Sequence, residues 1–486
     1  MKKRLMTGIL FLGVMFGIAG CGEKEKEPVS LTWSVFADCE DSFPKEWQDG
    51  FNALLKEKGI CAEVQFQAVS VDWQAAGEES FGTICRNGFA GQTKQSDILT
   101  DFGRTEDVWC YPDYIRNGIY EDLTPFMETA DGKKLKEAYP EAIWETVRYE
   151  RKIYGIPSFG ELTFSEYFVM KKTMAEALGI SDKTELPKSE LLALAEVYSE
   201  KNGRVYKIQY GSLTAPEGYE VIPGASWFLA GKMNGNYEVS LRLDNPAYLQ
   251  MLKEYQSYHE KGIWDGISLT DPNLFGYSVG SYSAETAMQA ASAEMGLDPD
   301  QYQVFHVEDY PLFLSGNTTG IHRSSEHQEE AFQVLAAAFS DEELVNYLVY
   351  GREGIEYHLE NRKAVVDRGI TESGGVTTKS MSNHILCLPS EREAEQKREI
   401  LMAYYDTLPK SIFLDRWIDT APVQEETAKL QKAYGYEEWQ DGLTDDLERD
   451  IQEVRKRISG TETETIRKLL ESQLNEQEEI WEDGNK

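Results

Sequence analysis

The sequence predicts an α/β protein with two lobes and a helical C-terminal segment. In the N-terminal part, strand-like and helix-like segments alternate, as they do in a parallel sheet flanked by helices. In the middle of the chain, an apolar run breaks at Gly155-Ile156-Pro157 and then resumes, which separates two groups of elements. The C-terminal part is rich in charged residues and has mainly helical periodicity.

The first group begins with a strand, a helix and a second strand. Residues 29–36 (VSLTWSVF) alternate apolar and polar side chains, which predicts a half-buried strand. Residues 46–59 place apolar side chains at helical spacing and end at Gly59, a residue that favours a helix stop. Residues 60–69 alternate again, so this region predicts the β-α-β unit of a parallel sheet.

Later segments continue the same alternation of strands and helices. We expect a short strand at 97–100, a strand at 163–170, and a helix that ends near Gly179. Residues 247–262 and 326–350 both have helical spacing, and the second pattern is the longer one.

The N-terminus predicts export and lipid attachment. A short basic segment precedes the apolar run 5–17, which is shorter than the about 20 residues that span a bilayer. This order is typical of a secretory signal. Ile18-Ala19-Gly20-Cys21 resembles a bacterial lipobox, which implies that Cys21 is acylated and becomes the new N-terminus. An ordinary signal peptide with a chance cysteine is the alternative.

Composition excludes several classes of function. The formal net charge of −35 repels nucleic acid and anionic lipid, so we expect no nucleic-acid partner. The hydrophobic content of 41% is enough for large packed cores, which argues against a disordered chain. The sequence has neither C-x-x-C nor H-E-x-x-H, so we expect no metal site and no cofactor. Besides Cys21 there are five cysteines, an odd number whose pairing the sequence leaves open: Cys39, Cys61, Cys85, Cys110 and Cys387.

Three stretches, in this order and after the lipobox, resemble the extracellular solute-binding proteins of ABC transporters, broadly the maltose-binding type. Residues 96–125 (SDILTDFGRTEDVWCYPDYIRNGIYEDLTP) resemble the strand that delivers a ligand loop and ends in a G-I-x-x-L closure. Residues 151–180 (RKIYGIPSFGELTFSEYFVMKKTMAEALGI) resemble the crossing into the second lobe. Residues 315–358 resemble the return crossing with its helix and a Gly-rich turn, YGREG. The family's GKxAM signature is replaced by LFGYSVGSYSAETAM at 274–288, which leaves the ligand contacts of the second lobe open.

This resemblance implies a two-lobed periplasmic-binding-protein-like fold of type II with a hinge between the lobes. Its domain organisation would be a signal peptide at 1–20, a tether at 21–28, a first lobe at 29–157 and 311–350, and a second lobe at 158–310 and 351–486. The lobes would close on ligand by hinge motion, and the loaded form would dock on a membrane permease.

The expected ligand is a solute held between the lobes, with an oligosaccharide favoured over a peptide, polyamine, metal chelate or phosphorylated compound. A sugar site needs carboxylates, amides or guanidinium groups for its hydroxyls and aromatic walls for its C–H faces. The resemblance places such residues in segments that contact ligand, where turn, cap or surface roles are the alternative: Asp38, Asp101, Phe102, Arg104 and Glu161. Aromatic candidates of the second lobe, for which a core position is the alternative, are Tyr219, Trp227, Tyr277 and Trp417.

Two enzyme functions remain as alternatives to transport. Gly276-Tyr277-Ser278-Val279-Gly280 matches the G-x-S-x-G pattern of esterases, but the preceding SLTDPNLF lacks the apolar strand that this turn follows. A glycosidase that uses two carboxylates is the other, although no pair stands out among the 84 acidic residues. We therefore expect a binding protein rather than an enzyme. We also expect it to be lipid-anchored on the extracytoplasmic face of the cell membrane and to serve ABC transporter permease subunits.

Overall fold

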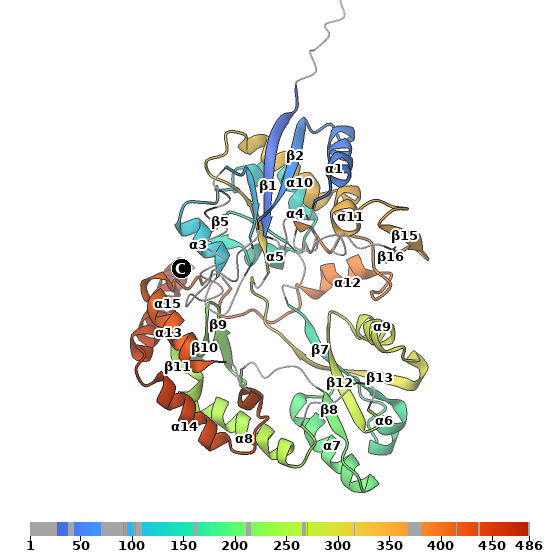
Figure 1. The fold of residues 1–486 in the computed structure, drawn as a ribbon, viewed down its shortest axis with the longest axis vertical. Helices are drawn as coiled ribbons and strands as arrows, with labels where there is room; N and C mark the ends of the chain where they lie inside the picture. Colours follow the sequence, from blue (N-terminus) through green and yellow to red (C-terminus); the bar gives the residue numbers. More distant parts are fainter. Residues whose placement is uncertain are drawn as a thin grey trace, which may run out of the picture.

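The computed structural model of the chain consists of two lobes, one above the other in Figure 1. It describes residues 27–36, 43–69, 95–101, 109–158, 163–209, 215–264, 271–314, 316–367, 381–414, 416–435 and 438–484, with the single positions 91, 93, 103 and 269. The predicted signal peptide and Cys21 lie outside these residues. Within the described ranges, no helix has the length and apolar character needed to cross a membrane.

The first lobe is built on a five-stranded mixed sheet in the order β2-β1-β3-β14-β6. Strand β1 pairs in parallel with both of its neighbours, whereas β14, the strand that returns from the second lobe, pairs antiparallel on both sides. The strands are β1 (Val29–Phe36), β2 (Ala62–Val69), β3 (Ile98–Thr100), β6 (Ile156–Pro157) and β14 (Thr318–Ile321). The β-α-β unit predicted for residues 29–69 is confirmed.

Helices cover this sheet because each has one apolar stripe to bury. The first of them buries Trp47, Phe51 and Leu55, which are spaced one turn apart. The pattern at 326–350, predicted as one long helix, forms two helices, since the carboxylate of Asp341 accepts from the amides of Glu343 and Leu344 and begins a new one. The helices of the first lobe are α1 (Lys45–Glu57), α3 (Cys110–Arg116), η1 (Phe126–Glu128), α4 (Ala130–Glu137), α5 (Glu141–Glu145), α10 (Gln328–Ser340) and α11 (Glu342–Tyr350), with the hairpin of β4 (Arg148–Tyr149) and β5 (Lys152–Ile153) beside them.

The segment that follows α11 also packs on the first lobe. It contains the hairpin of β15 (Tyr357–Glu360) and β16 (Lys363–Val366), and the helix α12 (Lys397–Tyr404). The side-chain amide of Asn383, which is fully buried, donates to the carbonyl oxygens of Ala138 and Phe339 at 3.0 Å each. The sequence assigned all of 351–486 to the second lobe. These contacts favour a boundary after α12, and the boundaries themselves stay a prediction.

The second lobe contains a four-stranded sheet in the order β13-β7-β12-β8. Its strands are β7 (Ser165–Lys171), β8 (Lys207–Gln209), β12 (Leu274–Ser281) and β13 (Tyr302–Asp309), and its helices are α6 (Lys172–Leu178), α7 (Lys188–Asn202), α9 (Ala284–Met295) and η3 (Pro299–Gln301). The predicted strand at 163–170 and the helix stop near Gly179 are confirmed. Gly179 has a φ of +72°, a conformation that favours glycine at a helix C-terminus.

A second, smaller sheet and the C-terminal helices complete this lobe, and Figure 1 shows them together on its left-hand side. The antiparallel strands β9 (Tyr219–Ile222), β10 (Ala225–Met233) and β11 (Asn236–Leu241) follow one another, and the helices are η2 (Arg242–Asp244), α8 (Pro246–Glu260), η6 (Ala421–Val423), α13 (Gln424–Tyr434), η7 (Glu438–Asp441), α14 (Leu447–Ile458) and α15 (Thr463–Gly484). The side chain of Asn475 on α15 pairs with both backbone groups of Tyr237, so the helix satisfies an edge residue of the sheet.

Three stretches of chain connect the lobes and run side by side. The amide of Ser158 on the first crossing donates to the carbonyl oxygen of Asn317 on the second at 2.9 Å. The amide of Leu312 on the second donates to the carbonyl oxygen of Pro409 on the third at 2.8 Å. The first two crossings were predicted, whereas the third, at 405–413, was not.

Candidate ligand site between the lobes

The candidate site is the region where the two lobes face each other. Strand β1 begins at the top of Figure 1, and its carboxyl end is directed toward the second lobe. In open α/β sheets, ligands bind at the carboxyl ends of strands. Four of the predicted contacts, Asp38, Phe102, Arg104 and Glu161, lie outside the described residues and stay predictions.

Asp101, at the end of β3, has no exposed surface. Its Oδ1 accepts from the amides of Gly103 and Thr318 at 2.8 and 2.9 Å, and its Oδ2 accepts from the hydroxyls of Thr318 and Tyr120. Burial raises the pKa of this carboxyl to about 6, although all these hydrogen bonds favour the charged form. The geometry therefore assigns Asp101 a structural role between β3 and β14, in place of the predicted contact with ligand.

Trp417 lies at the boundary between the lobes, in a cluster of aromatic rings. Its ring centroid is 4.6 Å from that of Trp109, 5.4 Å from that of Tyr111 and 5.9 Å from that of Tyr149. Its indole nitrogen donates to the carbonyl oxygen of Arg148 at 2.8 Å. Since the other three rings belong to the first lobe and Trp417 follows the third crossing, this cluster joins the two lobes.

The C-terminal helix holds Trp417 in place. The side-chain amide of Gln477 on α15 accepts from the amide of Trp417 at 2.9 Å and donates to its carbonyl oxygen at 3.1 Å. Gln473, one turn earlier, makes the same pair of bonds with Asp419. No local pattern signals these contacts, because the partners are 60 and 54 positions apart and a glutamine on a polar helix is common.

The other aromatic candidates are set into the second lobe. Trp227 on β10 is 5% exposed, and Tyr277 on β12 is 3% exposed and packs in a small core with Val169 and Ala291. Tyr219 on β9 is partly buried. These are core or core-edge positions, the alternative that the sequence analysis kept open for them.

Glu220, which follows Tyr219 on β9, forms hydrogen bonds with the third crossing. The carboxylate of Glu220 accepts from the hydroxyl of Ser411 and from the amide of Ile412, the latter at 3.0 Å. Burial raises the pKa of Glu220, and these two bonds counteract that shift. Sequence reasoning missed Glu220 because nothing local distinguishes it from the other glutamates.

Ser278 does not lie in the turn that an esterase nucleophile requires. It is in the middle of β12 and pairs with Phe168 of β7, so the G-x-S-x-G pattern forms a strand instead of a strand-to-helix elbow. The structure therefore gives no support to the esterase alternative. Within the described part of the chain, no group of His, Cys, Asp and Glu is arranged to hold a metal ion.

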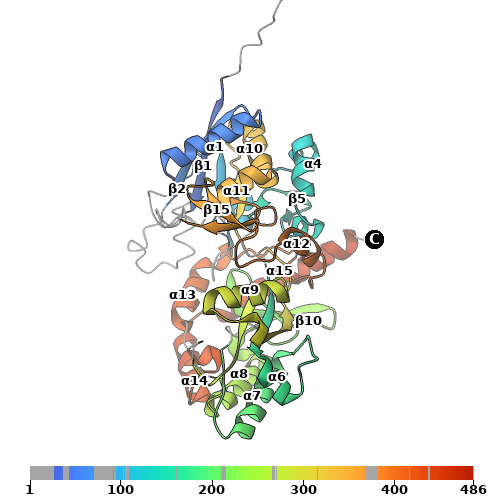
Figure 2. The same ribbon diagram turned by 90° about the vertical axis from the view of Figure 1, so that its right-hand side faces the viewer.

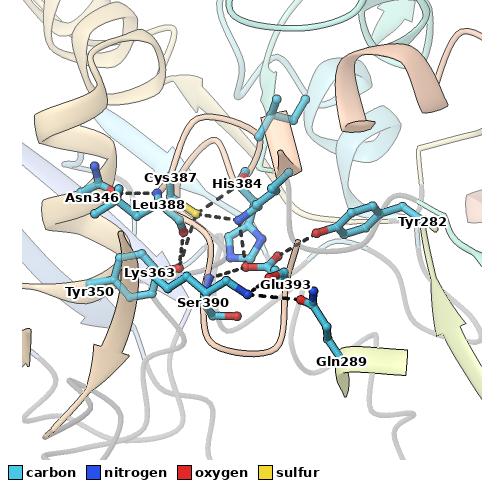
Figure 3. Close-up of polar contacts among 12 residues, drawn as sticks. Tyr282, Gln289, Asn346, Tyr350, Lys363, His384, Cys387, Leu388, Ser390 and Glu393 are labelled. Carbon is cyan, nitrogen blue, oxygen red and sulfur yellow. Dashed lines mark hydrogen bonds and ion pairs between the residues drawn. The ribbon is translucent and has the colours of Figure 1, made fainter. Parts of the chain in front are cut away.

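A polar cluster forms a second contact between the lobes (Figure 3). The hydroxyl of Tyr282, at the end of β12, donates to Oε1 of Glu393 at 3.5 Å, and Nζ of Lys363 on β16 donates to Oε1 of Gln289 on α9 at 3.3 Å. Burial by itself raises the pKa of Glu393, but the ammonium group of Lys397 holds it at about 2. In Figure 2, α9 lies beneath α12, consistent with this contact.

Comparison with known proteins agrees with the fold. No protein-family model matches the chain. A carbohydrate ABC transporter substrate-binding protein of Streptococcus pneumoniae is 24% identical over 332 residues, which cover 64% of this chain and 67% of the relative.

Solved structures extend the likeness to nearly the whole chain. The N-glycan transport solute-binding protein of Streptococcus pneumoniae superposes with a TM-score of 0.67 at 18% identity, covering 93% of this chain and 99% of that one. An extracellular solute-binding protein of Bifidobacterium longum subsp. infantis superposes with a TM-score of 0.52 at 13% identity, covering 93% and 98%. The resemblance indicated by the sequence motifs is thus confirmed: the chain has the two-lobed fold of the solute-binding proteins of ABC transporters and is related in sequence to one of them.

Proposed function

We propose that this protein is a lipid-anchored solute-binding protein that captures an oligosaccharide between its lobes and delivers it to the permease subunits of an ABC transporter. The observation that carries the proposal is the construction of the molecule from two α/β lobes joined by three adjacent crossings. Hinge closure about such connections is a recognised way of enclosing a ligand. In this proposal the chain has no catalytic function of its own.

The choice of oligosaccharide rests on two supports. The relative in sequence is described as a carbohydrate substrate-binding protein. The structural neighbours include the N-glycan transport protein in complex with Man5GlcNAc, at a TM-score of 0.60. We propose Asp38, Phe102, Arg104 and Glu161 as the ligand contacts of the first lobe and crossing.

Anchoring is a separate part of the proposal. The basic start, the short apolar run and the sequence Ile18-Ala19-Gly20-Cys21 support export followed by acylation of Cys21. The protein would then be held on the extracytoplasmic face of the membrane, with the tether 21–28 between the lipid and β1. A lipid-held binding protein stays close to its permease, which raises the effective concentration of each for the other.

A thermal-shift measurement tests the binding role. The chain without residues 1–21 is scanned against monosaccharides, oligosaccharides that include mannose- and N-acetylglucosamine-containing glycans, short peptides and polyamines. A ligand at about 100 times its Kd stabilises the folded state by roughly 2.7 kcal/mol, which is a visible rise in Tm. We expect this rise with one oligosaccharide series, and we expect Glu161→Ala to abolish it.

The matched control is Glu200→Ala, which removes an exposed carboxylate on α7, far from the crossings. It should keep the full ligand-induced rise. If no solute raises Tm and the protein instead hydrolyses an ester, with activity lost in Ser278→Ala, the binding role is wrong.

A further inference from the structure

The polar cluster at the lobe boundary contains a cysteine and a lysine in direct contact. Sγ of Cys387 lies 3.0 Å from Nζ of Lys397. Cys387 is 4% exposed and Lys397 only 1% exposed. A lysine is almost never so deeply buried unless it is paired, and here its carboxylate partner is Glu393, with Oε2 at 3.2 Å from Nζ.

The surrounding contacts hold these two side chains together. Figure 3 shows Cys387 and Glu393 on one folded-back segment beside Asn346 and Tyr350 of α11. The hydroxyl of Tyr350 donates to the carbonyl oxygen of Leu388 at 2.6 Å and lies 3.8 Å from Sγ of Cys387. The carboxylate of Glu393 also accepts from the amide of Ser390 at 2.9 Å. The contact of sulfur with nitrogen is therefore enforced by a packed segment rather than by two mobile surface side chains.

Cys387 forms no disulfide. Its sulfur faces the nitrogen of Lys397, an amine that becomes nucleophilic once the ammonium group loses a proton. We propose that Cys387 and Lys397 form a modification site at which dioxygen joins Sγ to Nζ through one bridging oxygen atom.

The reaction balances with dioxygen as the only co-reactant. The thiol S–H and one N–H of the neutral amine break, and S–O and O–N bonds form. The second oxygen atom leaves as water with the two hydrogens released. Sulfur and nitrogen each lose two electrons, and dioxygen accepts all four. The third proton of the ammonium group passes to solvent. Dioxygen is small and uncharged, so local opening of the packing is enough to admit it.

The separation favours a bridge over a direct bond. Cysteine oxidation by way of a sulfenic acid that condenses with a nitrogen gives an S–N bond, for which both atoms must move together to single-bond length. One inserted oxygen spans most of the 3.0 Å already present, so the packed segment barely moves.

The bridge would change the contact between the lobes. It removes the positive charge of Lys397, so Glu393 loses the buried group that keeps its carboxylate ionised. Glu393 is also the residue that accepts from Tyr282 of the second lobe. The oxidation state of this pair would therefore alter an interaction across the boundary, whatever solute the protein binds.

Mass spectrometry of the full chain tests the proposal. Protein purified under air should be heavier by one oxygen atom and lighter by two hydrogen atoms than protein purified without oxygen. A peptide that links the segments of Cys387 and Lys397 should carry this difference and should disappear after treatment with dithiothreitol.

Two variants and one control locate the bond. Cys387→Ser and Lys397→Arg should each lose the mass difference, whereas Cys61→Ser, which changes an exposed cysteine, should keep it. The comparison of aerobic with anaerobic wild type needs no variant, so poor folding of a variant leaves the test intact. An unchanged mass under air, a peptide in which Cys387 alone is oxidised, or a link without added oxygen overturns the proposal.

Discussion

Replacing Asp101 by asparagine should remove a pH-dependent component of the stability of the first lobe. An amide fits the site because Oδ1 can still accept from the amides of Gly103 and Thr318. The new Nδ2 would face the hydroxyls of Thr318 and Tyr120, which can turn and accept instead of donating. Asp101→Asn therefore keeps the number of hydrogen bonds while removing a buried charge.

The magnitude follows from the pKa of this carboxyl, which burial raises from 3.8 to about 6. A raised pKa means that the folded state holds its proton more tightly than the unfolded state. The stability contributed by Asp101 is then fully present below about pH 4 and is lost as the pH rises through about 6. A difference of about two pKa units corresponds to roughly 3 kcal/mol.

The assay is the free energy of unfolding, from denaturant or thermal curves, of wild type and Asp101→Asn between pH 4 and 7. From pH 4 to pH 7, the free energy of unfolding of the variant should rise relative to that of wild type by about 3 kcal/mol, because the amide does not titrate. Asp182→Asn, the same change at an exposed site, should show no such trend. A difference for Asp101→Asn that stays constant with pH would refute the reasoning.

Two further predictions concern the C-terminal helix and the anchor. Gln477→Ala removes both bonds to the backbone of Trp417, so it should lower the free energy of unfolding by about 1–3 kcal/mol and shift tryptophan fluorescence. The control Gln452→Ala, on the exposed face of α14, should do neither. Equal effects of the two variants would contradict the proposed role of α15. Cys21→Ser should abolish metabolic labelling with palmitate and release the protein from the membrane fraction, with Cys61→Ser as the control that keeps both; labelled Cys21→Ser would show that the lipid is attached elsewhere.

The strands and helices of the first β-α-β unit could be predicted because their signals are local. Trp47 and Phe51 recur at helical spacing on α1, and β2 alternates buried with exposed side chains over most of its length. The division at Asp341 could not be predicted in this way. An apolar stripe continues across it, and only the capping bonds of its carboxylate show that two helices meet there.

The candidate site was harder to predict than the fold. An aspartate after a strand has the same sequence context whether it binds ligand or hydrogen-bonds to a neighbouring strand. The partners of Asp101 that decide the matter, Thr318 and Asn317, come from the return crossing more than 200 positions away. The same holds for Trp417, whose neighbours Trp109 and Tyr149 belong to the other lobe.

The sequence by itself determined the class of fold, the order of its main elements, the first two crossings and the resemblance to solute-binding proteins. These features follow from side-chain periodicity and from motifs that are contiguous in the chain. Tertiary structure alone decided that a third crossing at 405–413 returns the chain to the second lobe. It also decided that Asp101 is buried and hydrogen-bonded between β3 and β14, and that Cys387 contacts Lys397. Each of these features depends on hydrogen bonds or packing between residues that become neighbours only when the chain folds.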